Sequence, residues 1–246
     1  MEKKSNTGLV VGLVISILVI IGLAGYIVYD KIQEKERINA PIIDVEKQEK
    51  LKEEDVKDLL KRIDEINSAL SGNYPIKDIN SIPTRDILSI GFNNIYGANY
   101  VSANYIENHI KYIIGDNVDV KHEDYLCSYD KIAFWKYKEG YYILNNEHPG
   151  HGGGHGYLVT TFFKDATLDE DTIVVNTNLL YEPASDTRGP IASYRSSTDG
   201  DYVINDISRE DLESEYEKIK DKLPVTTFTF KRSKLGGFNL ESVVIK

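Results

Sequence analysis

The chain has 246 residues, one cysteine, and a formal net charge of −10 from 29 basic and 39 acidic side chains. This length predicts one domain with appendages or at most two small domains, and a lone cysteine excludes an intramolecular disulfide. The acidic balance, without a cluster of basic and aromatic residues beyond residue 70, argues against nucleic acid and anionic lipid headgroups as partners.

The first predicted element is an apolar segment from Gly8 to Tyr29 that contains no charged residue. As an α-helix with a rise of about 1.5 Å per residue it would extend about 33 Å, which matches the hydrocarbon thickness of a bilayer. A cleaved signal peptide is the alternative, but the apolar run continues through residues 26–29, where a cleavage region turns polar. We therefore predict a transmembrane helix over residues 8–29, which anchors the chain in the lipid bilayer through Gly8, Leu13, Ile17, Ile21, Tyr26 and Tyr29.

The flanking segments predict how this helix is oriented and what it carries. Residues 1–7 form a short basic head, which tends to stay in the cytoplasm while a long following domain crosses the membrane. Residues 30–72 are predicted to be a juxtamembrane linker and a helical stalk. Apolar side chains that recur every three or four positions from Val56 to Leu70 predict the helix, and the polar segment KQEKLKEED at residues 47–55 is expected to be a solvated stalk. The domain proper is expected over residues 73–246, outside the cell membrane.

Two helices are predicted early in this domain. One is capped by Thr84 or Ser81, and a clearer one extends from its cap at Ser102 to Gly115. The period of the apolar residues then changes to two, which is typical of strands. The predicted strands lie at residues 131–137, 140–144, 157–163, 172–181, 190–196 and 201–205.

One more helix, capped by Ser208, precedes a C-terminal hairpin of residues 225–232 and 238–245. Early helices followed by antiparallel strands predict an α+β domain. We expect helices packed on a curved antiparallel sheet, with an NTF2-like or cystatin-like fold by analogy. Such an analogy of fold assigns no function.

A glycine-rich loop, EHPGHGGGHGY at residues 147–157, holds three histidines between two predicted strands. His148, His151 and His155 are a candidate metal site, because three imidazole nitrogens and one open position define a catalytic zinc site. Zinc or copper would suit these nitrogens, and a metal-dependent hydrolase is the function such a site implies. The alternative is a flexible turn, since its glycines supply positive φ angles and its flexibility opposes preorganisation. The turn is the favoured interpretation, and no cofactor is then expected.

Residues beside this loop supply two further hypotheses. The loop backbone can approach a ligand closely, and Tyr141, Tyr142 and Tyr157 would offer a stacking surface for sugar rings. With 17 tyrosines in the chain, ordinary sheet residues are the simpler interpretation. A pair of Cys127 and His122 would form a nucleophilic thiolate, although a lone cysteine beside strand residues is more often a small buried hydrophobe.

The layout of one membrane helix and an outside domain, with a composition rich in Ile, Lys, Asn and Tyr, resembles the single-pass, outward-facing proteins of low-GC Gram-positive bacteria. Membrane-anchored sortases share the layout, but the Thr-Leu-x-Thr-Cys context of their catalytic cysteine is missing around Cys127. We therefore expect a non-enzymatic, membrane-tethered module that binds an envelope protein or glycan. The metal-dependent hydrolase is the alternative.

Overall fold

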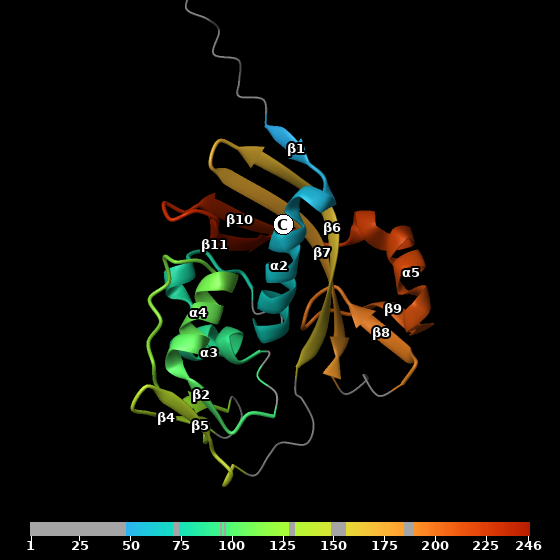
Figure 1. Cartoon of the computed structure of the whole chain (residues 1–246). Coiled ribbons are helices and arrows are strands. Elements are labelled where there is room, and N and C mark those ends of the chain that lie inside the picture. Colours follow the sequence, from blue (N-terminus) through green and yellow to red (C-terminus); the bar gives the residue numbers. More distant parts are fainter. Residues whose placement is uncertain are drawn as a thin grey trace, which may run out of the picture. The chain divides into compact units, whose positions relative to one another are not determined.

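The structure is a computed structural model that describes residues 48–70, 74–93, 95, 97–127, 131–148, 156–184 and 189–246 (Figure 1). The predicted transmembrane helix at residues 8–29 and residues 30–47 of the predicted linker lie outside the described residues. Within the part of the chain that the structure describes, no helix is long and apolar enough to cross a membrane. Residues from Gln48 to Lys246 form one compact unit.

The larger of two sheets is antiparallel and has seven strands in the order β1-β6-β7-β10-β11, with β8 attached to β7 and β9 attached to β8. The predicted strands beyond residue 156 and the C-terminal hairpin are confirmed, whereas β1 was not predicted. The strands are β1 (Glu49–Leu51), β6 (Tyr157–Asp169), β7 (Thr172–Pro183), β8 (Ile191–Arg195), β9 (Tyr202–Ser208), β10 (Thr226–Arg232) and β11 (Phe238–Ile245).

Helix α2 (Lys57–Leu70) follows the short helix η1 (Glu53–Val56) and packs beside β6 (Figure 1). Its residues Leu59, Ile63 and Ile66 are buried in one cluster with Val175 and Phe228 of the sheet. The sequence predicts this helix, but the expectation that it belongs to a stalk outside the domain is wrong. Burying each of these side chains contributes roughly 1.5–3 kcal/mol, so the helix packs on the core. The domain therefore begins before residue 73.

Helices α3 (Thr84–Phe92) and α4 (Ala103–Ile113) pack against each other. A Cβ atom at Gly91 would lie only 2.5 Å from Cγ2 of Ile106, so glycine at this position permits the close approach of the two helices. The cap predicted for α4 is confirmed, because Oγ of Ser102 accepts a hydrogen bond of 3.2 Å from the backbone N–H of Tyr105. The predicted stop is confirmed too, with Gly115 at a φ of +133°.

A second, smaller hydrophobic cluster lies under helix α5 (Leu212–Ile219). The ring of Tyr216 stacks on Phe162 of β6 at a centroid distance of 3.8 Å, and its hydroxyl donates to Oδ1 of Asn178 at 3.0 Å. Ser208 caps the preceding turn, as predicted. The described residues also include the short 3-10 helices η2 (Ile79–Ser81), η4 (Arg209–Asp211) and η5 (Lys220–Lys222).

The smaller sheet is antiparallel, has four strands in the order β2-β5-β4-β3, and lies against α3 and α4 (Figure 1). On its inner face, the ring of Phe92 from α3 stacks on Trp135 at 5.2 Å and meets Tyr142 edge-on at 4.9 Å. The predicted α+β class with helices packed on antiparallel strands is therefore confirmed, but the strands form two sheets and not the one curved sheet that we expected. The strands are β2 (Tyr100–Ser102), β3 (Tyr125–Leu126), β4 (Ala133–Lys138) and β5 (Tyr141–Leu144).

Candidate functional site

The smaller sheet carries polar and aromatic side chains on both of its faces. Successive residues of a strand point to opposite faces, so β5 sends Tyr142 inward and Tyr141 and Ile143 outward. Tyr142 is fully buried. The inner and the outer face therefore offer different chemistry and are two separate candidates.

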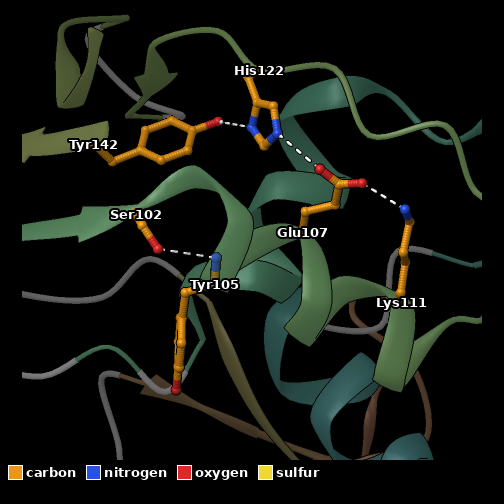
Figure 2. Close-up of polar contacts among 6 residues, drawn as sticks. All are labelled: Ser102, Tyr105, Glu107, Lys111, His122 and Tyr142. Carbon is orange, nitrogen blue, oxygen red and sulfur yellow. Dashed lines mark hydrogen bonds and ion pairs between the residues drawn. The ribbon is translucent and has the colours of Figure 1, made fainter. Parts of the chain in front are cut away.

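A chain of polar contacts on the inner face joins the sheet to α4 (Figure 2). The hydroxyl of Tyr142 lies 3.0 Å from Nδ1 of His122, and Nε2 of His122 lies 3.4 Å from Oε2 of Glu107. The other carboxylate oxygen of Glu107 accepts from Nζ of Lys111 at 2.5 Å, one helical turn further along. The ring of His122 also stacks on Tyr137 at 5.4 Å. We call Tyr142, His122, Glu107 and Lys111 the inner array.

Electrostatics set the protonation states at the two ends of the inner array. Burial raises the pKa of the Tyr142 phenol, so the hydroxyl stays protonated at neutral pH and hydrogen-bonds Nδ1 of His122. The hydrogen bond from Lys111, and after it that from His122, lowers the pKa of the Glu107 carboxyl group, so Glu107 is ionised at neutral pH. With Tyr142 as the donor to Nδ1, the neutral histidine carries its proton on Nε2, toward the carboxylate of Glu107.

This arrangement resembles an acid–base chain, but its geometry suits a structural role better. The group at the inner end, Tyr142, is buried and protonated, so it cannot attack or deprotonate a bound molecule. Both ring nitrogens of His122 already face Tyr142 and Glu107, which argues against the hypothesis that His122 activates Cys127. The inner array therefore fixes β5 on α4 rather than forming a reactive centre.

The outer face combines apolar rings with lysines at the outward positions of β2, β5 and β4. The exposed fractions are 71% for Tyr100, 50% for Tyr141, 45% for Ile143 and 40% for Phe134. Exposed apolar side chains are ordinary when scattered, but a contiguous group of them marks an interaction surface. We call this surface the aromatic–lysine face; its residues are Tyr100, Phe134, Lys136, Lys138, Tyr141 and Ile143.

The strand register places five of the six members of this face in two rows. Tyr100 pairs with Ile143, and Ile143 pairs with Lys136. In the next row, Tyr141 pairs with Lys138 on one side and with Ser102 on the other. Each row therefore passes from an apolar side chain to a lysine across neighbouring strands, which lie about 4.8 Å apart.

Of the three histidines predicted as a metal site, one, His148, lies among the residues that the structure describes. The backbone N–H of His148 donates to the carbonyl of Asn145 at 2.9 Å, and its ring meets Phe134 edge-on at 5.3 Å. His151 and His155 lie outside the described residues, so the zinc or copper site stays a prediction. Among the residues that are described, no group of three or more His, Cys, Asp or Glu side chains is arranged to hold a metal ion.

The three tyrosines predicted as a sugar-stacking surface do not lie on one surface. Tyr141 is exposed, but Tyr142 is buried in the inner array. The hydroxyl of Tyr157 donates to the carbonyl of Thr198, and its ring meets Tyr181 in the larger sheet. The neighbours of Tyr141 on the aromatic–lysine face were missed, although the alternation in residues 133–138 is a signal that points to them.

Comparisons with protein-family models, with curated proteins and with solved structures find no match to this chain. The function must therefore be argued from the residues and from their geometry.

Proposed function

We propose that this chain is a membrane-tethered binding module that presents its α+β domain outside the cell membrane and binds an envelope component or a partner protein. The tether rests on the uncharged segment from Gly8 to Tyr29, and the orientation on the short basic head before it. The binding role rests on one observation, the aromatic–lysine face. An NTF2-like or cystatin-like fold stays a prediction and carries no part of this proposal.

The composition of the aromatic–lysine face supports binding rather than catalysis. Tyr100, Tyr141 and Ile143 lie together on two neighbouring strands with much of their side chains in solvent. Removal of such apolar area from water is favourable by about 25 cal/mol per Å², and a bound partner would bury this area. Tyrosine suits this role, because its ring buries area while its hydroxyl keeps a hydrogen-bonding group at the surface.

The experiment that tests the binding role uses the full chain in mild detergent and washed envelope fragments of a Gram-positive bacterium. We expect the wild type to co-sediment with the fragments and Tyr100→Ser/Tyr141→Ser to lose at least tenfold in affinity. Tyr112→Ser is the matched control, because Tyr112 on α4 is 54% exposed and lies outside the face. If the double variant sediments as well as the wild type does, the face is not the binding surface and the proposal fails.

The tether has a separate test. We expect the full chain to fractionate with membranes, and a C-terminal reporter enzyme to be active only on the outer side. Recovery of the intact chain as soluble material would remove the tether from the proposal.

The metal-dependent hydrolase that would use His148, His151 and His155 is tested by metal analysis of the purified full chain. The binding proposal expects less than stoichiometric zinc and copper, and a melting temperature that a chelator leaves unchanged. Stoichiometric metal that disappears in His151→Ala/His155→Ala would favour the hydrolase instead. His148→Ala alone then shows whether all three histidines are ligands.

A further inference from the structure

We propose that the ligand of the aromatic–lysine face is an anionic polysaccharide, whose sugar rings stack on Tyr100 and Tyr141 while its carboxylate or phosphate groups pair with Lys136 and Lys138. This inference rests on the proposed binding function and adds the chemical class of the ligand. It depends on the order of side chains in the two rows of the face, on their charge, and on the rigidity of the strands that carry them.

The rows place a flat apolar surface and a cation at the spacing of a charged sugar unit. Tyr141 lies directly across from Lys138, and Ile143 lies between Tyr100 and Lys136. Neighbouring strands lie about 4.8 Å apart, and a lysine side chain extends several ångströms from its strand. A pyranose ring that covers a tyrosine with its apolar C–H face thus brings an anionic substituent within reach of the lysine in the same row.

The charge of this face is opposite in sign to that of the chain as a whole. The chain has a net charge of −10, yet the outward positions of the described strands β2, β4 and β5 carry two lysines and no carboxylate. Glu139 and Glu147 border the face at opposite ends of the β4–β5 hairpin. The carboxylate of Glu147 approaches Nζ of Lys136 at 3.9 Å and is 89% exposed, so this pair is weak and a ligand anion can replace it.

The same features favour a polysaccharide over two other polyanions. A single-stranded nucleic acid is held through many phosphate contacts along a positive groove, and two lysines on an acidic chain do not provide one. An acidic peptide would satisfy the lysines but has no rigid apolar face to cover Tyr100 and Tyr141. A sugar ring offers both an apolar face and hydroxyl groups that hydrogen-bond the tyrosine hydroxyls.

The inner array holds the outer side chains in place. Because Tyr142 bonds to His122 and packs on Phe92, the backbone of β5 between Tyr141 and Ile143 is fixed from within. Trp135, stacked on Phe92, fixes β4 between Phe134 and Lys136 in the same way. A face on rigid strands loses little conformational entropy when it binds, which favours affinity.

The test measures binding of the full chain in detergent to immobilised dextran, carboxymethyl-dextran and phosphorylated dextran. We expect at least tenfold tighter binding to one or both anionic forms than to neutral dextran, with an affinity that falls as salt rises. The anionic dextran that binds more tightly shows whether the face favours carboxylate or phosphate groups. Lys136→Gln/Lys138→Gln should abolish the preference for the charged forms, whereas Lys231→Gln/Lys234→Gln, two exposed lysines of the β10–β11 hairpin, should leave it unchanged.

Poly-glutamate and a single-stranded oligothymidylate test the rejected ligand classes. Binding of either as tightly as the anionic dextrans, with Tyr100→Ser/Tyr141→Ser ineffective, would overturn the polysaccharide assignment. Equal binding of neutral and charged dextran, or none of either, would overturn it as well. If the tyrosine variant still loses its affinity for envelope fragments in those cases, the proposed binding function stands and only the ligand class is wrong. Unchanged melting temperatures show that the variants are folded.

Discussion

Strands β7 and β5 show how differently the two sheets of this protein are covered. In β7, the consecutive residues Leu179, Leu180 and Tyr181 are all buried, because packed side chains cover both faces of the larger sheet. In β5, Tyr142 is buried while its neighbours Tyr141 and Ile143 are half exposed. Both three-residue stretches are apolar, so the difference lies in what covers them. An apolar strand with one uncovered face indicates a surface that another molecule covers.

Polar side chains also differ between the larger sheet and the outer face of the smaller sheet. In the larger sheet, Asn178 donates from Nδ2 to the carbonyl of Pro224 at 2.8 Å and accepts from Tyr216, so its side chain is used internally. On the outer face of the smaller sheet, the ion pair of Lys136 among the described residues is a long, exposed contact to Glu147. Polar side chains of the larger sheet such as Asn178 are thus used to stabilise the fold, whereas Lys136 on the outer face of the smaller sheet stays exposed to solvent.

The largest expected effect comes from comparing one residue type on the two sheets. Phe228→Ala should cost about 3–5 kcal/mol of the free energy of unfolding, because Phe228 is fully buried on β10 and its loss leaves a cavity. Phe134→Ala on the outer face should cost less than about 1 kcal/mol. Urea denaturation of the full chain measures both. Equal losses would mean that the outer face is covered within the protein itself, which would weaken the comparison.

A smaller loss is expected at the buried arginine that joins three elements. Arg62 of α2 donates from Nε to the carbonyl of Ile113 and from Nη2 to that of Phe238, each at 2.8 Å. Arg62→Met keeps much of the side-chain volume but leaves both carbonyls without this donor, which should cost about 2–3 kcal/mol in urea denaturation. Arg232→Met, at an exposed position of β10, is the control and should cost less than about 0.5 kcal/mol. A similar loss in both variants would contradict the role of Arg62.

The inner array should contribute less to the free energy of unfolding than Phe228 or Arg62 does. Tyr142→Phe removes the hydroxyl that bonds His122, and we expect a loss of about 1 kcal/mol. Tyr141→Phe, one residue away but on the outer face, should leave the free energy of unfolding unchanged. The same two variants separate stability from binding, because only Tyr141→Phe removes a hydroxyl from the proposed sugar-binding surface. Loss of stability in the Tyr141 variant would show that its hydroxyl has an internal partner.

Local patterns predicted the elements of this fold better than their packing. The α4 helix was predicted with its cap at Ser102 and its stop at Gly115, because capping and positive-φ signals depend on a few neighbouring residues. The position of α2 was also predicted, but not that it packs in the core. An amphipathic helix presents the same periodic stripe whether it packs on a sheet or on another helix, so the stripe does not name its partner.

The aromatic–lysine face was harder to predict, because a local pattern does not show what packs against each face of a strand. The alternation of Lys136 and Lys138 with Trp135 and Tyr137 indicates which face of β4 points outward, but it does not show whether another part of the chain covers that face. The inner array depends on His122, which comes from the connection between α4 and β3 and reaches Glu107 only in the folded chain. The i, i+4 pair of Glu107 and Lys111 was the only part of it that the sequence displays.

The smallest expected effect is a pH dependence carried by Glu107. The folded-state pKa of this carboxyl group lies below its unfolded value, which is about 4.3. Its contribution to stability is therefore fully present above that value and is lost as the pH falls through the folded-state pKa. The Glu107 side chain is about a third exposed, so solvent screening keeps this contribution below about 1 kcal/mol.

The measurement compares the wild type with Glu107→Gln by urea denaturation between about pH 3 and pH 7. We expect a constant difference in the free energy of unfolding above about pH 5, and a difference that shrinks as the pH falls further. Because Lys111 is the main cause of the lowered pKa, the difference should be smaller throughout in a Lys111→Gln background. A difference that grows on acidification would mean that the inner array stabilises a protonated Glu107. The sheet would then be held to α4 by a different set of hydrogen bonds, and the rigidity assigned to the outer face would need another source.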